Sequence, residues 1–433
     1  MVTVRDTLRR SLPRGTAVRG VGLIAGATVA GQALVFVLSP VLSRIYSPAQ
    51  FGLCGVFVSL VTILNVVGTL RYELAVPLPD DEVSALDLLV GGFAANLAII
   101  GVLALCVPAV RGPLAAWTGT PQLAGYLWLL PPTLFATGAY QLLIYWAVRR
   151  REYTLLSQRM LAYSLAQAGA TAGLGLLGLR PAGLMLGTLA AHAAGGLTIA
   201  RKLLRHDRAL LPQVSLSGMR RMARRYVRFP VLSSWSGLVN SAGTVVPLLL
   251  VSRYFGPTVA GWYVLTTRVV GAPSTVVSEA VAQVYLGEVA TLARQDVDAL
   301  RRLFVVSLRR LLTVGVIATV AVAAPAPLWF PVVFGDRWHD AGRYAVLLIP
   351  FYVGQFVAAP LSSTLAVFER QDIQLAWDWA RLVCSVASVV VPIRLGASPL
   401  VTIGVFGVVM GGLYAVLLLV NFRAIGSASS AEG

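Results

Sequence analysis

Apolar stretches of membrane-spanning length recur along the whole chain. They lie near residues 20–43, 48–70, 84–108, 123–148, 160–178, 182–200, 229–252, 258–286, 307–333, 344–368, 375–393 and 399–422. A helix needs about 20 apolar residues to cross the hydrocarbon core of a bilayer, and these stretches have about that length. The pattern therefore predicts an all-α polytopic membrane protein with about twelve transmembrane helices.

Local sequence signals mark some ends of these helices. Ser47, Pro48 and Gln50 stand where a capping box with a first-turn proline requires them, so a helix is expected to begin there. Ser84 and Asp87 suggest a second capping box, at the start of the third span. Prolines inside several spans, Pro273 among them, predict helix breaks of the kind that transporters tolerate.

A short segment repeats at six-helix spacing. Residues 43–48 (SRIYSP), followed by Gly52, match residues 252–257 (SRYFGP), followed by Gly261, with the same internal spacing. Each copy ends the first helix of a six-helix half. Because six is an even number, both halves have the same orientation, which predicts two parallel six-helix lobes around a central cleft. A turn sequence that arose twice independently is the alternative explanation.

The expected lobes divide the chain into five parts. These are a basic N-terminal segment (1–19), an N-terminal six-helix lobe (20–200), a basic linker with an amphipathic helix (201–228), a C-terminal six-helix lobe (229–422) and a tail (423–433).

Composition excludes an ordinary water-soluble protein. Of the 433 residues 57% are hydrophobic and only 12% are charged, whereas soluble domains have about 25% charged residues. The 35 basic residues exceed the 18 acidic ones. If the N-terminus is inside, the inner segments hold roughly four times as many basic residues as the outer loops, with only Arg268 assigned to a span. The positive-inside rule therefore predicts that both termini are cytoplasmic.

Arg268 is the most informative candidate site residue. It lies about three turns after Pro257, roughly 16 Å deep and close to the bilayer midplane. A charge at that depth is expected to face the protein interior or a water-filled cavity. A guanidinium can bind phosphate through two hydrogen bonds, so Arg268 is a candidate ligand for an anionic substrate. A structural ion pair is the alternative.

Other polar residues in or beside the spans are weaker candidates. Glu279 lies nominally on the same helix face as Arg268, either as a site for a coupling proton or Na⁺ or as a plain interfacial carboxylate. Asn65 and Asn240 can line the cavity or form interhelical hydrogen bonds. Arg71 and Glu73 follow the second span, where they can form a cytoplasmic gate or extend to the interface.

The linker predicts contact with the membrane surface. Met219, Met222, Ala223 and Tyr226 form an apolar stripe on a helix that is otherwise basic, which is typical of a helix lying in the bilayer interface. The arginines expected to contact anionic lipid headgroups are Arg220, Arg221, Arg224, Arg225 and Arg228. The helix is tethered between two spans, so nucleic acid is not an expected partner.

The chain shows no sequence sign of covalent chemistry. Its three cysteines and three histidines are scattered, and no nucleotide-binding or hydrolytic motif is present in a suitable context. We therefore expect a protein that is not an enzyme and that has no metal site and no cofactor.

Several segments resemble the Wzx-like polysaccharide transporters of the multidrug/oligosaccharidyl-lipid/polysaccharide (MOP) superfamily. They are residues 38–48 (LSPVLSRIYSP), 51–52 (FG) and 70–79 (LRYELAVPLP), then residues 261–265 (GWYVL) with Pro273, and residues 368–371 (FERQ). The first block is the most specific.

The resemblance implies a flippase in the bacterial plasma (inner) membrane. Such a protein moves an undecaprenyl-pyrophosphate-linked oligosaccharide outward by ion-coupled alternating access, for the assembly of O-antigen (lipopolysaccharide), capsule or exopolysaccharide. The expected partners are the lipid-linked oligosaccharide, anionic lipids and other polysaccharide-assembly proteins. The alternatives are a multidrug or small-molecule exporter of this superfamily or of the major-facilitator class, a polysaccharide polymerase or ligase, and a scaffold of the assembly machinery.

Overall fold

The computed structural model describes residues 14–293, 296–368 and 370–429, which form helices and turns without a β-strand. The N-terminal lobe consists of α2 (Arg14–Ile45), α3 (Pro48–Gly68), α4 (Glu82–Trp117), α5 (Leu130–Arg149), α6 (Tyr153–Leu176) and α7 (Ala182–His206). The C-terminal lobe consists of α9 (Ser234–Thr266), α10 (Ala272–Leu292), α11 (Val297–Ala323), α12 (Ala326–Phe334), α13 (His339–Leu347), α14 (Ile349–Leu361), α15 (Ser363–Val367), α16 (Gln371–Arg394) and α17 (Pro399–Ser429). The short helix α8 (Leu216–Arg225) joins the lobes.

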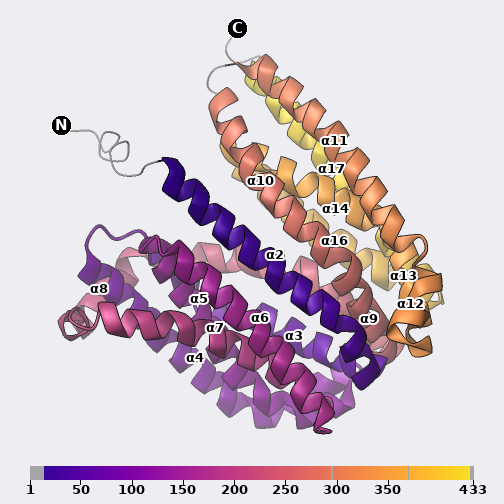
Figure 1. The fold of residues 1–433 in the computed structure, drawn as a ribbon, viewed down its shortest axis with the longest axis horizontal. Coiled ribbons are helices and arrows are strands. Elements are labelled where there is room, and N and C mark those ends of the chain that lie inside the picture. The colour runs from indigo at the N-terminus through magenta and orange to yellow at the C-terminus, as the bar shows by residue number, and fades with distance from the viewer. Residues whose placement is uncertain (1–13, 294–295, 369, 430–433) are drawn as a thin grey trace.

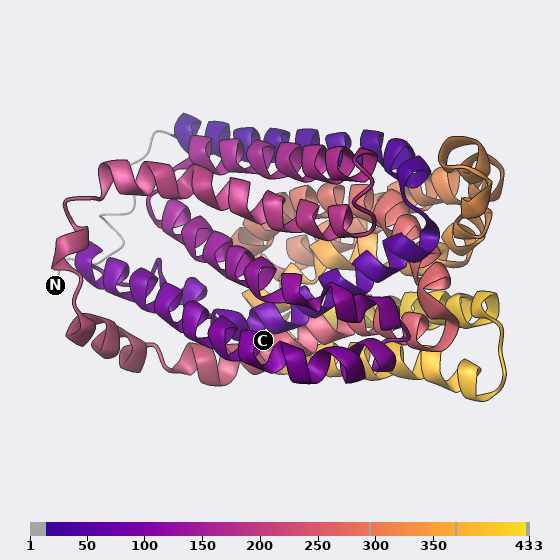
Figure 2. The same cartoon turned by 90° about the horizontal axis from the view of Figure 1, so that it is seen from below.

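The described residues contain nine helical segments long and apolar enough to span a membrane, or ten if one bent pair forms a single span. The bent pair, Asp336–Leu347 with Ile349–Val367, changes direction by 54°. One of the nine, Phe229–Leu292, is interrupted at Gly256, where φ is 84°, so this segment consists of two successive helices. With α6, which packs along α2 and α7 (Figure 2), the helices account for six crossings in each lobe.

Several expected boundaries differ in the structure. The third span was expected over 84–108, but α4 is longer. The stretch 307–333 is divided between α11 and α12 at Ala324 and Pro325, because proline provides no N–H to continue the helix. The stretch 344–368 consists of three short helices. α7 extends into the expected linker and α17 into the expected tail, while residues 1–13 and 430–433 lie outside the described part.

One of the two expected capping boxes is confirmed and the other is wrong. Ser47 accepts a hydrogen bond from the Gln50 backbone N–H, and Gln50 accepts one from that of Ser47. At the third span the cap is Asp81, which accepts from the Ser84 backbone N–H at 2.7 Å. Asp87 instead accepts from the backbone N–H of Ser215 at 3.0 Å, and so anchors the start of α8 to α4.

The two lobes diverge toward the end where α2 begins and α17 ends, which we call the open end, and they meet at the opposite, closed end (Figure 1). The two repeat segments face each other at the closed end. A Cβ atom on Gly52 would lie 1.9 Å from the carbonyl oxygen of Pro257, and one on Gly261 would lie 1.8 Å from that of Pro48. Both glycines are therefore required for this backbone approach between the lobes.

Two reciprocal hydrogen bonds accompany this contact. Ser43 donates through its hydroxyl to the carbonyl of Phe334 at 3.1 Å, and Ser252 donates to that of Thr118 at 2.9 Å. Each bond links the first helix of one lobe to the end of the third span of the other lobe. We call these two bonds and the Gly52–Gly261 contact the interlobe latch.

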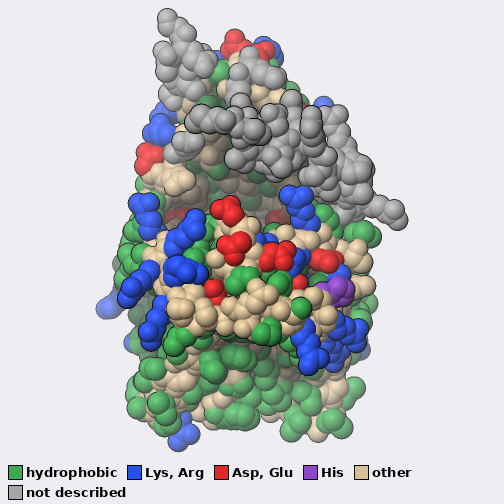
Figure 3. All heavy atoms as spheres, turned by 90° about the vertical axis from the view of Figure 1, so that its left-hand side faces the viewer, with side chains coloured by type: hydrophobic (Ala, Val, Ile, Leu, Met, Phe, Trp, Pro, Cys, Tyr) green, Lys and Arg blue, Asp and Glu red, His purple; other side chains and the backbone are tan. Residues whose placement is uncertain are grey.

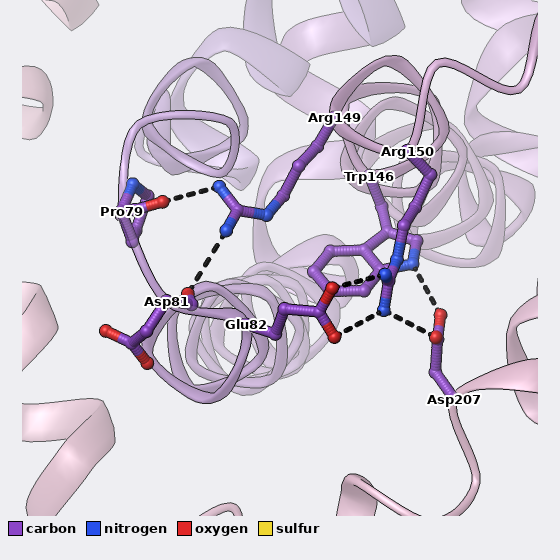
Figure 4. A network of polar contacts seen from close by, with 7 residues as sticks. All are labelled: Pro79, Asp81, Glu82, Trp146, Arg149, Arg150 and Asp207. Atoms are coloured by element: carbon purple, nitrogen blue, oxygen red, sulfur yellow. Dashed lines mark hydrogen bonds and ion pairs between the residues drawn. The ribbon is translucent and has the colours of Figure 1, made fainter. Parts of the chain in front are cut away.

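A polar network ties together the helix ends of the N-terminal lobe at the open end (Figure 4). Arg150 forms ion pairs of 2.6 Å with both Glu82 and Asp207, and Trp146 donates to Asp207 at 3.1 Å. Arg149 donates to the backbone carbonyls of Pro77, Pro79 and Asp81. The network joins α4, α5 and α7 and fixes the loop between α3 and α4.

The Arg150→Ala substitution is expected to lower the free energy of unfolding by about 2 kcal/mol, because it leaves the mostly buried Asp207 carboxylate without its charged partner. Glu152→Gln is the control, since the pair between Glu152 and Lys202 is about one-third exposed on both sides and should contribute less than about 1 kcal/mol. Thermal unfolding of the purified protein measures both. Equal shifts in the two variants would contradict the prediction.

Candidate central cavity

A cavity of about 510 Å³ lies between the lobes. Helices α3, α6 and α7 of the N-terminal lobe and α9, α10 and α14 of the C-terminal lobe contribute to its wall, together with the turn that connects α9 to α10. Its polar lining includes Ser59, Thr62, Gln167, Thr188, Thr244, Thr267, Arg268, Thr275 and Gln355, and Cys54 lies on the wall as well. The size is within the range of small-molecule sites, and the lining combines apolar surface with polar groups.

Arg268 lines this cavity from a π-helical turn, Thr267–Gly271. The turn precedes Pro273, which provides no N–H for the carbonyl group four residues earlier, and this explains the break in the helical hydrogen bonding. The side chain is half-buried and has no ion pair or hydrogen bond with the described residues. Its guanidinium is thus positioned to bind an anion that enters between the lobes.

Glu279 lies in an adjoining cavity of about 210 Å³, between α10 and α14. The two cavities share Thr275 and Gln355, so the cavity of Glu279 adjoins that of Arg268. The Glu279 side chain is exposed, in keeping with a position nearer the open end.

The two asparagines occupy different places. Asn65 is buried between α3 and α5, where it donates to Gln141 at 2.9 Å and does not line the central cavity. Asn240 is exposed on α9, one turn from the cavity residue Thr244, and accepts a hydrogen bond from Arg381 at 2.9 Å. The structure therefore places Arg268 and Glu279 in adjoining cavities and Asn65 inside the N-terminal lobe.

The sequence analysis missed an ion pair inside a transmembrane helix. Arg381 and Asp378 lie on α16, with 3.7 Å between the charged atoms, and Asp378 is buried. Arg381 also donates to the backbone carbonyl of Asn240 at 2.8 Å. Arg268 is thus not the only arginine within a span, because Arg381 occupies the middle of the 375–393 stretch. The i,i+3 spacing of opposite charges was the available sequence signal.

Arg71 and Glu73 lie just after α3, at the open end of that helix. Their charged atoms are 3.6 Å apart, and the Arg71 guanidinium also approaches Gly237 of α9, in the other lobe. Burial raises the pKa of the Glu73 carboxyl, while the Thr69 hydroxyl and the Arg71 charge act in the opposite direction. Leu70 and Arg71 both have positive φ angles, of 51° and 59°, a conformation that is costly without glycine. This strained turn places Arg71 between the lobes.

Helix α8 is amphipathic, as expected, but its apolar face packs on the N-terminal lobe and not on the bilayer. Met222 is buried against the N-terminal lobe, whereas Arg220, Arg221, Arg224, Arg225 and Arg228 are exposed. Figure 3 shows this end of the molecule, with basic side chains on both flanks of a central group of acidic ones. The five exposed arginines in and after α8 are available to anionic headgroups, and such a contact stays a prediction.

Comparisons with known proteins identify the family. The family described as "Polysaccharide biosynthesis protein" matches residues 41–343. The "Succinoglycan biosynthesis transport protein ExoT" of Rhizobium meliloti (strain 1021) is 28% identical over 385 residues, which cover 86% of this chain and 73% of that protein.

Solved structures share the fold at low sequence identity. The structure described as "Lipid II flippase MurJ, inward closed conformation" has a TM-score of 0.68 at 11% identity and covers 93% of this chain and 87% of its own. An inward-facing multidrug resistance MATE transporter of the MOP superfamily has a TM-score of 0.61 at 16% identity, with 95% of each chain covered. A MOP superfamily transporter from Pyrococcus furiosus has a TM-score of 0.63 at 15% identity, covering 95% of this chain and 96% of its own.

These findings confirm the predicted architecture of two six-helix lobes and the resemblance to polysaccharide transporters. The relatives are named as transporters and flippases and not as enzymes. The chain is a multi-pass membrane protein that belongs to the family described as "Polysaccharide biosynthesis protein", and it shares the fold of solved MOP superfamily transporters.

Proposed function

We propose that this protein is a flippase that moves an undecaprenyl-pyrophosphate-linked oligosaccharide across the bacterial plasma membrane for surface-polysaccharide assembly. The observation that carries the proposal is Arg268, a guanidinium without an ion pair among the described residues, in a polar cavity between two lobes. Burying such a charge is costly unless an anion or water meets it. The pyrophosphate of the substrate supplies that anion, and the arginine binds it without a covalent step.

The arrangement of the lobes supports an alternating-access cycle. We place the open end in the cytoplasm, in agreement with the distribution of basic residues. The substrate head then enters from the cytoplasm while its polyprenyl tail stays in lipid. Opening of the interlobe latch and closure of the other end would expose the head to the outside. Glu279, in the cavity that adjoins that of Arg268, is the proposed site of a coupling proton or Na⁺.

A reconstituted assay tests the proposed function. Purified protein in liposomes should move a fluorescent polyprenyl-pyrophosphate oligosaccharide from one leaflet to the other. The measurement is the fraction of the fluorescence that a membrane-impermeant quencher removes, which should rise as the lipid reaches the outer leaflet. The Arg268→Ala protein should produce no such rise. Efflux of cationic drugs without movement of the glycolipid would instead assign the protein to the multidrug exporters.

Cys54 provides a separate test of the cavity. Its side chain lines the same cavity as Arg268, whereas Cys106 is exposed on α4 away from it. In inside-out vesicles we expect a charged thiol reagent to label Cys54 and to label Cys106 much more slowly, because water fills the cavity but not the lipid around α4. Polyprenyl-pyrophosphate oligosaccharide should slow labelling of Cys54. Mass spectrometry of single-cysteine variants measures this, and an unreactive Cys54 would count against a hydrated cavity.

A further inference from the structure

Four side chains form an aromatic and polar cluster in the N-terminal lobe that the central cavity does not include. The rings of Tyr140 on α5 and Tyr163 on α6 stack with centroids 5.7 Å apart, and the His192 ring on α7 meets both edge-on at 5.5 and 5.1 Å. Arg159 donates to the Tyr140 hydroxyl and lies over its ring. Arg159 forms no ion pair with the described residues.

The cluster lies next to the cavity on the N-terminal lobe. Tyr163 is one helical turn from Gln167 and two turns from Thr171, both of which line the cavity. His192 is likewise one turn from Thr188 and two from Leu184, which also line it. In both helices the step from the cavity to the cluster leads toward the open end.

The cluster has hydrogen-bonding groups that no other described residue occupies. Tyr163 and His192 are only partly buried. The Nδ1 atom of His192 contacts the Thr188 carbonyl at 2.8 Å, which makes this nitrogen the donor and leaves Nε2 as an acceptor. The Tyr163 hydroxyl and the Gln167 amide have no hydrogen-bond partner among the described residues. The cluster and the adjacent Gln167 thus offer aromatic rings, several acceptors, and the Gln167 and hydroxyl donors.

We propose that this cluster is a saccharide-binding subsite, which holds the sugar attached to the pyrophosphate. A pyranose presents C–H groups on its ring faces and hydroxyls at its edges, and the cluster offers aromatic surface and polar groups in the same arrangement. The inference rests on the proposed function, because Arg268 across the cavity fixes where the pyrophosphate lies. Arg268 then recognises the anion common to all such lipids, and the Tyr163 cluster recognises the carbohydrate.

Two ligands separate the two roles: polyprenyl pyrophosphate without sugar, and the same lipid carrying its oligosaccharide. Binding to the purified full-length protein is measured by quenching of intrinsic fluorescence or by calorimetry. We expect Tyr163→Ala to weaken binding of the glycosylated lipid about tenfold and to leave binding of the bare lipid unchanged, since one aromatic contact contributes about 1 kcal/mol or more. Tyr163→Phe keeps the ring and should lose at most about threefold.

The controls make each failure distinct. Tyr153→Ala, at the start of the same helix, should change neither affinity. Arg268→Ala should weaken binding of both ligands equally. If neither ligand binds the wild-type protein, the proposed function fails together with the subsite. Retained binding of the bare lipid shows that a variant is folded. If Tyr163→Ala weakens binding of both ligands equally, or weakens binding of neither, the proposal of a saccharide subsite is overturned.

Discussion

Replacement of Arg268 by alanine is expected to abolish transport, with the rate of glycolipid translocation falling about 30- to 4000-fold. The side chain is the arginine of the central cavity and has no ion pair with the described residues. Loss of a desolvated charge-assisted contact typically costs 2–5 kcal/mol, and about 1.4 kcal/mol corresponds to a tenfold change. Cells with the variant should lose surface polymer and accumulate the lipid-linked intermediate on the inner leaflet.

The conservative variant and a matched control define this result. Arg268→Lys keeps the charge but loses the bidentate geometry, so we expect it to retain part of the activity. Arg394→Ala removes an exposed arginine at the end of α16, outside the cavity, and should leave transport unchanged. Full activity of the Arg268→Ala protein would remove this residue from the mechanism.

The sequence was sufficient to predict the lobes because their determinants are local. Apolar length, the Ser47 capping box and the repeated SR-x-aromatic-x-P segment each depend on residues close together in the chain. The depth of Arg268 follows from counting turns from Pro257. Depth alone does not give the direction in which a side chain points. Asn65 was a cavity candidate by depth, yet it is directed into the N-terminal lobe and binds Gln141.

Other features depend on contacts between distant segments and were therefore missed. The pairing of Arg381 with Asn240 joins α16 to α9, and the cluster of Tyr140, Tyr163 and His192 joins three helices. Arg71 reaches the other lobe because it adopts a positive φ angle, which nothing in its residue type favours. The helix break near Pro273 was expected as a proline effect, but the shape of the break depends on neighbouring helices.

The interlobe latch predicts the second large effect. Valine at Gly52 would place side-chain carbons well inside contact distance of the Pro257 backbone, which cannot move as a flexible side chain can. Such overpacking typically costs 1–3 kcal/mol or more, so the closed end should be forced apart and transport should fall at least about tenfold. Gly261→Val makes the reciprocal change against Pro48 and should have the same effect.

The side from which Cys54 reacts distinguishes a failed latch from a misfolded protein. In the wild-type protein a membrane-impermeant thiol reagent added outside intact cells should label Cys54 slowly, because the latch closes that route. In Gly52→Val and Gly261→Val the same reagent should label Cys54 from outside.

Gly101→Val on α4 is the control, since no neighbouring atom lies within 4 Å of its added Cβ. Ser43→Ala with Ser252→Ala removes the two interlobe hydrogen bonds, about 1 kcal/mol each, together with the bond of Ser43 to the Pro40 carbonyl in its own helix, and should give intermediate labelling. Unchanged outside labelling in both glycine variants, with transport intact, would show that this contact does not close the cavity.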